Sequence, residues 1–430
     1  MEKLPEGWKR LRLGDVCKMV IGGTPSRDNL LYWDKEKSTN NLWVSIKDMD
    51  RRYIENTEEY LTDEGVKHSN AKLIPPNTVL LSFKLTIGKI SISKKFLYTN
   101  EAIAAIITKN SELDNLLLFY GLHKWDLLQD VDQAVKGMTL NKNKLQAIKI
   151  LYPSSLPEQH KIADILETID NAIERTDTII EKYKRIKQGL TQDLLTRGVV
   201  GNEELGVMNY ELRDEKKHRF KDSPLGRIPE EWEVVELQNK DIIKLITDGS
   251  HFSPQPVENG EYYIATIENI SDNKIDMPSC KKISRKDYEN LKKNNCEPQT
   301  NDVLFTKDGT IGVVIKHIQK ENLVVLSSIA IIRSKQESLL SNYLVQYLKS
   351  NHIWKQLETL SGGSALKRIV LRDIKGLLIL LPPLSEQHII ASILSQTDET
   401  IEKEQKYKQK LESIKQGLME DLLTGKVRVS

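Results

Sequence analysis

The sequence predicts an α+β protein built from two related halves, each a globular α/β domain followed by one long helix. Three observations support this fold class: a strongly repeated helical segment, a weaker repeat in the globular regions, and a hydrophobic pattern of seven-residue period in both helical segments. A repeat on the scale of a whole domain excludes a solenoid, whose units are about 20–50 residues long. We therefore expect the 430 residues to form two similar domains and two similar helices.

The two helical segments begin and end with the same short motifs. The first copy starts at Leu156 with LPEQHKIADIL, and the second starts at Leu384 with LSEQHIIASIL. About half of the paired positions that follow are identical without a gap, and both copies end in KQGL-xx-DLLT. Ser155 and Glu158 fit a capping box at the start of the first helix, and Gly198 fits its end.

Apolar residues in both segments alternate at spacings of four and three, which is typical of a coiled coil. In the first segment they are Ile162, Leu166, Ile169, Ile173, Ile180, Tyr183, Leu190 and Leu194. In the second they are Ile390, Leu394, Ile401, Leu411, Leu418 and Leu422, with interruptions at Glu404 and Lys408. We assign the helices to residues 155–198 and 384–430, each about 60 Å long. Because an exposed apolar seam needs a partner, we expect an antiparallel coiled coil with pseudo-two-fold symmetry.

Two pairs of residues at matching positions of the two helices are candidates for contact with a partner. His160 and His388 lie in each first turn, where positive charge opposes the helix dipole. Packing or contact with a partner therefore explains them better than catalysis. Gly189 and Gly417 lie in KQGL, where a glycine costs about 1 kcal/mol relative to alanine. The same cost in both copies favours close backbone approach at the seam or to a partner, with a tolerated glycine as the alternative.

The globular regions share anchor sequences, while the loops between the anchors differ. LPEGWKRLRL at Leu4 resembles IPEEWEVVEL at Ile228, so that Trp8 matches Trp232. VLLSFKLTIGKI in the first half likewise resembles VLFTKDGTIGVV in the second. A common scaffold with unlike loops is expected of two modules that present different surfaces to related ligands.

Each domain is predicted to contain a twisted sheet and helices. Short β-branched runs at 102–108 and 323–332 predict strands, and helices are expected near 113–128 and 339–357. We assign the domains to residues 1–154 and 228–383. The intervening segment 199–227 is polar and charged and lacks apolar periodicity, which predicts a linker.

Composition and motifs argue against catalysis by this chain. The three cysteines form no CxxC pair, and P-loop, HExxH and N/D-P-P-Y/F motifs are all missing. We therefore expect no catalytic residue, no metal site and no cofactor in this chain. No apolar run approaches the roughly 18 residues of a membrane helix, and the first residues lack the apolar stretch of a signal peptide, so we expect a cytoplasmic location.

Together the motifs resemble one known family, the specificity subunits of Type I restriction-modification enzymes. The repeated helix starts and the KQGL-xx-DLLT helix ends carry this resemblance in both halves. FKDSPLGRIPEEWEV, from Phe220, is similar to the family's junction into its second half. GGTPSRDNLLYW, from Gly22, and TDGSHFSP, from Thr247, resemble two subtypes of recognition domain.

The resemblance implies two target-recognition domains, each reading one half of a split site in double-stranded DNA. It implies that the helices set the separation of the half-sites and dock two methyltransferase subunits, which a restriction subunit can join. The chain would then be a non-catalytic specificity subunit, with S-adenosylmethionine, ATP and Mg expected in the partner subunits. The bases recognised and the length of the spacer do not follow from the residues.

Polar and basic residues in the divergent loops are the candidates for DNA contact, because such side chains read base edges and hold phosphates. In the first domain they are Thr24, Ser26, Arg27, Lys47, Lys84, Thr86 and Lys89. In the second domain they are Ser250, His251, Thr266, Lys307 and Thr310. The alternative is that Gly22, Gly23 and Gly249 only make tight turns and that the polar residues around them are solvated.

Two other functions remain open from the residues alone. One is a coiled-coil adaptor without sequence-specific DNA binding, and the other is a stand-alone DNA-modifying enzyme with an unrecognised site. A lack of sequence-dependent DNA binding would favour the adaptor. Methylation or cleavage of DNA by the purified chain alone would favour the enzyme.

Overall fold

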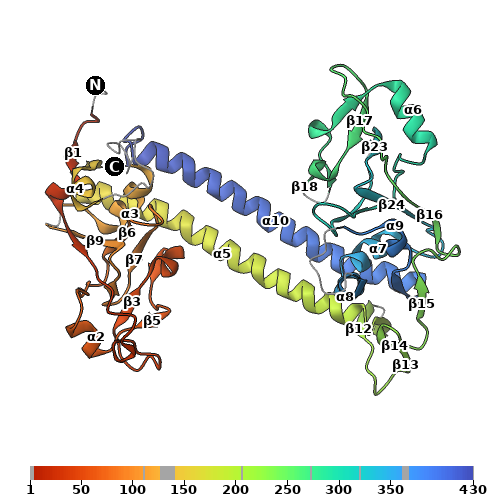
Figure 1. Ribbon diagram of the computed structural model, residues 1–430, viewed down its shortest axis with the longest axis horizontal. Helices are drawn as coiled ribbons and strands as arrows, with labels where there is room; N and C mark the ends of the chain where they lie inside the picture. Colours follow the sequence, from red (N-terminus) through yellow and green to blue (C-terminus); the bar gives the residue numbers. More distant parts are fainter. Residues whose placement is uncertain are drawn as a thin grey trace. The chain divides into compact units, whose positions relative to one another are not determined.

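A computed structural model describes residues 4–109, 112–125, 141–204, 207–271, 274–318, 321–360 and 368–429. The chain forms two compact units: unit 1 comprises residues 1–178 and 406–430, and unit 2 comprises residues 179–405. Helix α5 (Leu156–Leu194) and helix α10 (Leu384–Leu422) lie within the predicted ranges, and each begins in one unit and ends in the other (Figure 1). Each unit therefore contains one globular domain, the start of the helix that follows it and the end of the other helix.

The globular part of unit 1 is built on a five-stranded sheet. Its strands are β1 (Trp8–Arg12), β2 (Cys17–Ile21), β3 (Leu42–Val44), β4 (Tyr53–Ile54), β5 (Glu59–Tyr60), β6 (Val79–Ser82), β7 (Ile90–Ser93), β8 (Tyr98–Thr99), β9 (Ile103–Thr108) and β10 (Lys149–Pro153). The main sheet has the order β2-β9-β6-β7-β4, beside a three-stranded sheet β5-β3-β8 and the pair β1-β10. Its pairings are antiparallel except between β4 and β7.

The globular part of unit 2 repeats this plan. Its strands are β15 (Glu233–Glu236), β16 (Ile243–Asp248), β17 (Tyr262–Ala265), β18 (Ile270–Ser271), β19 (Lys274–Ile275), β20 (Lys281–Ile283), β21 (Val303–Thr306), β22 (Val314–Lys316), β23 (Asn322–Val325), β24 (Ile329–Ser334) and β25 (Leu378–Leu381). The four-stranded sheet β16-β24-β21-β22 matches β2-β9-β6-β7, the sheet β20-β17-β23 matches β5-β3-β8, and β15-β25 matches β1-β10. In both three-stranded sheets the middle strand pairs antiparallel on one side and parallel on the other. The α+β fold with two copies of one domain is thus confirmed.

Short helices flank these sheets. In unit 1 they are α1 (Leu13–Val16), α2 (Asp63–Lys67), α3 (Asn115–Lys124), α4 (Lys142–Ala147) and the 3-10 turns η1 (Leu30–Tyr32) and η2 (Ile46–Asp50). In unit 2 they are α6 (Arg285–Lys293), α7 (Ser341–Leu348), α8 (Asn351–Leu360), α9 (Leu371–Lys375), η3 (Ile267–Asn269) and η4 (Met277–Ser279). Two predicted segments each form two elements: the run 323–332 contributes to strands β23 and β24, and 339–357 contributes to helices α7 and α8. The predicted helix at 113–128 corresponds to α3, and its residues 126–128 lie outside the described part.

Helices α5 and α10 run antiparallel within each unit, and ion pairs mark their register. In unit 1, Asp170 lies 2.6 Å from Lys415 and Asp177 lies 2.7 Å from Lys408, so seven residues forward along α5 match seven residues backward along α10. In unit 2, Lys187 of α5 lies 2.5 Å from Asp398 of α10. The polar interruption at Lys408 is therefore compensated by a carboxylate of the facing helix.

Each unit has a core that includes both helix ends as well as the sheet. In unit 1, Leu166 near the start of α5 is buried together with Leu422 at the end of α10. In unit 2, Leu394 near the start of α10 is buried with Leu194 at the end of α5. This packing explains why the start and the end of each helical repeat kept their sequences. None of the helices in the described residues combines the length and the apolar character needed to cross a membrane.

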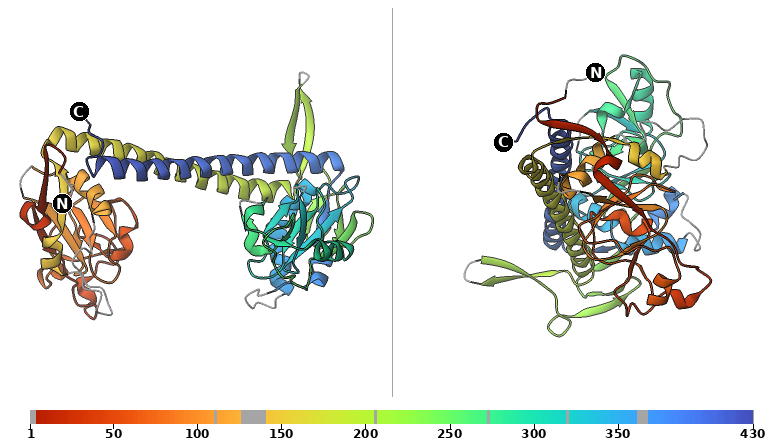
Figure 2. Two further views of the ribbon diagram at one scale, coloured as in Figure 1. Left: turned by 90° about the horizontal axis from the view of Figure 1, so that it is seen from above. Right: turned by 90° about the vertical axis from the view of Figure 1, so that its left-hand side faces the viewer.

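The segment 199–227, predicted to be a linker, is folded into two antiparallel hairpins. Strand β11 (Val199–Glu204) pairs with β12 (Val207–Leu212), and β13 (Phe220–Ser223) pairs with β14 (Gly226–Pro229). The yellow-green hairpin β11-β12 stands out from the rest of unit 2 (Figure 2). Because each of these strands pairs only within its hairpin, the segment can be structured without the apolar periodicity of a core strand.

Candidate nucleic-acid interface and helix junctions

A buried glutamine fixes the start of each long helix in the same way. Gln159 of α5 donates through Nε2 to the carbonyl oxygens of Glu112 and Pro153, both at 2.8 Å, and its Oε1 accepts from the backbone N–H of Asp114 at 2.8 Å. Gln387 of α10 makes the equivalent two donations, at 2.9 and 3.0 Å, and one acceptance, at 2.9 Å. Both side chains are essentially inaccessible. The motif EQH therefore joins each helix to the domain that precedes it.

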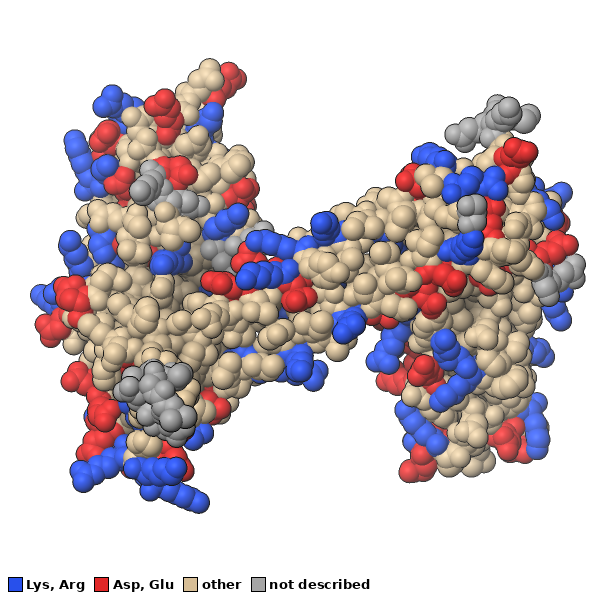
Figure 3. Space-filling view, turned by 180° about the vertical axis from the view of Figure 1, so that it is seen from behind, with Lys and Arg blue, Asp and Glu red and all other residues tan. Residues whose placement is uncertain are grey.

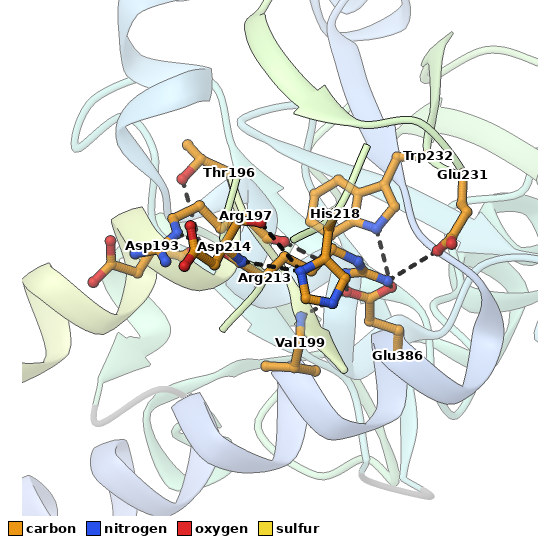
Figure 4. Close-up of polar contacts among 10 residues, drawn as sticks. All are labelled: Asp193, Thr196, Arg197, Val199, Arg213, Asp214, His218, Glu231, Trp232 and Glu386. Atoms are coloured by element: carbon orange, nitrogen blue, oxygen red, sulfur yellow. Dashed lines mark hydrogen bonds and ion pairs between the residues drawn. The ribbon is translucent and has the colours of Figure 1, made fainter. Parts of the chain in front are cut away.

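The glutamate of the same motif lies at a second junction in unit 2 (Figure 4). Glu386 receives both terminal nitrogens of Arg213, which follows β12, and one of these nitrogens also lies 3.0 Å from Glu231. The indole N–H of Trp232 and the backbone N–H of Val199 donate to the same carboxylate at 3.0 and 2.7 Å. The Arg213 and Glu386 side chains are both only 6% exposed. A buried carboxylate is stable only with such partners, because its desolvation is otherwise uncompensated.

Unit 1 has a matching junction with a different donor. Glu158 is buried and receives Nε and Nη2 of Arg428 at 2.5 and 2.8 Å. Arg428 comes from the segment after α10, and its side chain is 45% exposed. Trp8, the equivalent of Trp232, buries its indole N–H without a hydrogen-bond partner among the described residues. Both glutamates are thus bound by an arginine from the segment after the other helix, but only the junction in unit 2 is closed from water.

The repeated histidines and glycines lie outside these junctions. His160 is 59% exposed with Nε2 3.6 Å from Asp114 Oδ2, and His388 is also exposed. Gly189 and Gly417 are exposed, and a Cβ atom at either position would meet no described atom within 4 Å apart from its chain neighbours and the nearby backbone of its own helix. The expected close approach at the seam is therefore wrong for this chain, which leaves contact with a partner or a tolerated glycine.

Each unit has a groove beside the helix segment that carries this glycine. In unit 2 the groove measures about 360 Å³ and lies between α5 and the junction of α7 with α8. Its basic lining residues are Lys184, Lys187, Lys349, Lys355 and His352. In unit 1 the groove measures about 560 Å³ and lies between α10 and α3, with Lys124, Lys415, Glu412, Glu420 and His123 in its lining. Burial lowers the pKa of both His352 and His123.

The two Thr-Ile-Gly motifs form the same turn between equivalent strands. After β6, Ser82 Oγ donates to the carbonyl of Thr86 at 2.6 Å and accepts from the N–H of Lys89 at 2.9 Å. After β21, Thr306 Oγ1 makes the same bonds to Thr310 and Val313, also at 2.6 and 2.9 Å. The candidates Thr86 and Thr310 are both exposed on these turns. The turns are therefore a common support for different exposed side chains.

The divergent glycine-containing loops also share one attachment point. Gly22 lies against the backbone carbonyl of Thr99 in β8, and Gly249 lies against that of Val325 in β23. A Cβ atom at these two positions would approach those oxygens to 1.8 and 2.1 Å, so both sites require glycine. The glycines therefore mark close backbone approach at equivalent strands.

In the first domain the loop at Gly22 is held by intramolecular contacts. Arg27 pairs with Glu59 and its guanidinium stacks 3.8 Å from the ring centroid of Trp33. Thr24 donates to Glu101, whereas Ser26 is exposed and only its carbonyl is bonded, to the Trp33 indole. Arg27 thus has a clear structural role, and its side chain is still 53% exposed.

The candidate lysines of the first domain gather around the Thr-Ile-Gly turn and η2. Lys89 donates to the carbonyl of Ile46 at 3.2 Å and to Asp50 at 2.5 Å, which ties the turn to η2. Lys47 on η2 is exposed, and Lys84 on the turn is half-buried with Nζ over the ring of Phe83. The structure therefore brings Lys47, Lys84 and Lys89, which are far apart in sequence, to two adjoining segments.

In the second domain the candidates divide between surface and interior. Lys307 is only 2% exposed, with Nζ 3.2 Å from Asp248 Oδ2, so it is a buried structural cation, in contrast to the expected DNA contact. Ser250 is also buried and bonds the backbone of Phe252. His251 is exposed 3.3 Å from Asp248 beside a cleft of about 500 Å³. Sequence reasoning missed these burials because position in a loop does not reveal depth.

The remaining candidate, Thr266, forms the N-terminal cap of η3. Its side chain accepts from the N–H of Glu268 at 3.3 Å and bonds Asn269 at 3.1 Å. On the face displayed in Figure 3, basic and acidic side chains are intermixed over both globular parts. The described part of this face therefore has no large surface area of a single charge sign.

The cysteines and acidic residues form no reactive centre in the described ranges. Cys17, Cys280 and Cys296 are buried and free, and burial raises the pKa of Cys17 to about 12 and that of Cys280 to about 11. These thiols are therefore poor nucleophiles. No group of three or more His, Cys, Asp or Glu residues in the described ranges is arranged to hold a metal ion.

Residues that the sequence did not single out include Glu386 and the buried pair Gln159/Gln387, while Glu158 was considered only for a capping box and is instead paired with Arg428. Their identity in both repeats was a signal that could have found them. Another is Leu85, which is the most exposed large apolar side chain of the described residues, at 90%. Its equivalent in the second turn is Gly309, so the two copies differ at this point.

Two copies of one scaffold that present unlike loops, with helices that begin and end alike, define a duplicated recognition protein. The family model described as "Type I restriction modification DNA specificity domain" matches the chain twice, over residues 5–185 and 229–413. The chain belongs to this family, and it has the two target-recognition domains of a Type I specificity subunit.

Named relatives agree with this assignment, and a solved structure shares the fold. The MjaVIII specificity subunit of Methanocaldococcus jannaschii is 29% identical over 441 residues, covering 99% of this chain and 94% of that protein. The EcoR124I/EcoR124II specificity subunit of Escherichia coli is 30% identical over 188 residues, 41% of this chain and 43% of that protein. The crystal structure of a Type I S subunit from M. genitalium has the same fold, with a TM-score of 0.61 at 12% identity, covering 98% of this chain and 99% of that one.

Proposed function

We propose that this chain directs a Type I restriction-modification assembly to a split DNA site, with each globular domain reading one half-site. The observation that carries the proposal is the duplicated scaffold: four strands of the main sheet, the three-stranded sheet and the Thr-Ile-Gly turns have the same arrangement in both units, while the exposed residues on the loops differ. Similar scaffolds suit similar docking on duplex DNA, and different loops suit different base sequences.

The exposed candidates are the residues that would meet DNA in this proposal. They are Ser26, Arg27, Lys47 and Thr86 in the first domain and His251 and Thr310 in the second, together with the half-buried Lys84. In this proposal the chain is non-catalytic and cytoplasmic. S-adenosylmethionine, ATP and Mg would be bound by partner subunits, which transfer the methyl group or hydrolyse ATP, while this chain selects the site.

The test is an exchange of the first globular domain, followed by methylation-sensitive sequencing of host DNA. Residues 1–154 are replaced by the first domain of another family member, and the split motif is compared with that of the original protein. We expect only one half of the methylated motif to change. A change in both halves, or a motif that is the same with and without this gene, contradicts the proposal.

We also propose that two methyltransferase subunits dock on the long helices, one in each groove beside Gly189 and Gly417. The support is the exposure of both glycines and the open space around them, next to a groove in each unit. A mid-helix glycine costs about 1 kcal/mol relative to alanine, and close approach of a partner's backbone would offset that cost.

Leucine at each glycine tests this docking, because the side chain would fill the open space. Gly189→Leu and Gly417→Leu should each remove one methyltransferase subunit from the assembly, and the double variant should remove both. Lys182→Leu, at an exposed position of the same helix, is the matched control and should retain both. Native mass spectrometry with purified methyltransferase subunits measures the stoichiometry. Full recruitment by the double variant would rule out docking at the glycines.

A further inference from the structure

The two Thr-Ile-Gly turns differ at one position of unusual backbone conformation. Leu85 has a φ of 62° and the equivalent Gly309 has a φ of 70°. Both turns are closed by a second glycine at matching positions, Gly88 with φ 94° and Gly312 with φ 83°. The left-handed region is accessible to glycine without strain and is unfavourable for leucine. The first copy thus has a leucine in a backbone conformation that the second copy fills with an unstrained glycine.

Contacts within the chain do not explain this leucine. Leu85 is 90% exposed, so its side chain gains almost nothing from burial. The fold of the turn does not need it either, because Gly309 supports the same hydrogen bonds in the second copy. An exposed apolar side chain held in a strained conformation on a rigid turn is the kind of feature found at binding sites.

The surroundings of Leu85 favour a nucleic acid over another partner. Lys84 precedes it, and Lys89 of the same turn is bonded to η2, which carries the exposed Lys47. In the second copy Lys84 is replaced by Asp308, which lies 3.7 Å from Arg368. Lysines around a protruding apolar group suit phosphates on either side of a base contact, since apolar side chains meet the methyl group of thymine or unstack a base step.

We propose that Leu85 is a specificity-determining residue that contacts the bases of the half-site read by the first domain. This inference rests on the proposed DNA-recognition function and adds a chemical class of contact to it. Lys84 would hold a neighbouring phosphate and so position the turn. The second domain, with Gly309 at this place, would read its half-site without such an apolar contact.

The decisive variant is Leu85→Gly, which copies the second turn and relieves the strain at the same time. A structural role predicts that this variant loses stability, whereas a role in recognition predicts unchanged or higher thermal stability with altered binding. The full chain assembled with its methyltransferase subunits is used to select from a pool of randomised DNA duplexes. We expect Leu85→Gly to lose about tenfold discrimination at one or two positions of one half-site, and to keep the other half-site unchanged.

Three further variants make the outcome specific. Leu85→Met keeps an apolar group of similar size and should retain the selectivity that Leu85→Gly loses. Lys84→Ala should weaken binding to all sequences about equally and reduce its salt dependence, as expected for a phosphate contact. Gly309→Leu should leave the half-site of the first domain unchanged.

Each result separates this inference from the broader function. If the unaltered assembly selects no split motif, the proposed DNA recognition itself fails. If it selects a motif and Leu85→Gly selects the same motif with the same discrimination, the role of Leu85 is overturned. Loss of methyltransferase subunits from the Leu85→Gly assembly, with an unchanged motif, would identify Leu85 as a protein contact and would also overturn the proposal.

Discussion

Both helix junctions pair a buried glutamate with an arginine, but the two arginines differ in burial. In unit 2, Glu386 and Arg213 are both sealed from water, and Trp232 donates a third side-chain hydrogen bond. In unit 1, Glu158 is equally buried, but Arg428 is nearly half exposed. The acceptor glutamate kept its sequence position in the repeat, while the arginine comes from a hairpin in one unit and from the segment after α10 in the other. The two junctions thus share a buried glutamate and differ in the segment that supplies the arginine.

The largest expected effect is the difference between losing the two arginines. Arg213→Met should lower the free energy of unfolding of unit 2 by about 3–5 kcal/mol, because it leaves the buried Glu386 carboxylate without its cation. Arg428→Met should cost clearly less, because Arg428 itself is 45% exposed and water screens its ion pair with Glu158. Guanidinium denaturation, combined with hydrogen exchange at the first turns of α5 and α10, measures both.

A double variant sharpens this comparison. Replacing Glu386 by Gln in the Arg213→Met background removes the uncompensated charge and should recover part of the lost stability. Equal losses from Arg213→Met and Arg428→Met would show that burial of the arginine does not determine the strength of these junctions.

The glutamines test what the two junctions have in common. Gln159→Ala and Gln387→Ala should each lower the free energy of unfolding by about 1–3 kcal/mol, because each leaves buried backbone groups without partners. The two losses should be similar, since both side chains make three equivalent bonds. Gln409→Ala, at an exposed position of α10, is the matched control in thermal denaturation. A clearly larger loss in one unit would break the equivalence of the helix starts.

The smallest expected effect concerns the groove histidines and pH. Burial lowers the pKa of His123 and of His352 from the ordinary value of 6.5. The unfolded chain therefore binds these protons more readily, so the stability contribution is complete above pH 6.5 and is lost as pH falls below it. The thermal midpoint should drop as pH is lowered from about 8 to about 5, and the drop should be smaller in the double variant His123→Gln/His352→Gln. His251 is exposed and serves as the control. If His251→Gln made the drop in thermal midpoint smaller by the same amount, the pH dependence could not be assigned to His123 and His352.

Much of the fold could be predicted from local sequence patterns. The heptad spacing located α5 and α10, since a 3.5-residue apolar repeat has few other solutions. The shared anchors around Trp8 and Trp232 indicated two copies of one domain, and both tryptophans are core residues. The charge of a residue did not predict whether it is buried. Lys307 was a candidate for DNA contact, but it is buried against Asp248.

The sequence by itself determined that the chain is duplicated, where its long helices lie, and that its two domains share a scaffold with different loops. These features follow from periodicity and repetition, which are local properties of the chain. Only the tertiary structure decided that Glu and Gln of the EQH motif are buried while His is exposed, that segment 199–227 forms hairpins, and that Leu85 and Gly309 occupy the same left-handed position. Those outcomes depend on what packs against each side chain, and the packing partners come from distant parts of the chain.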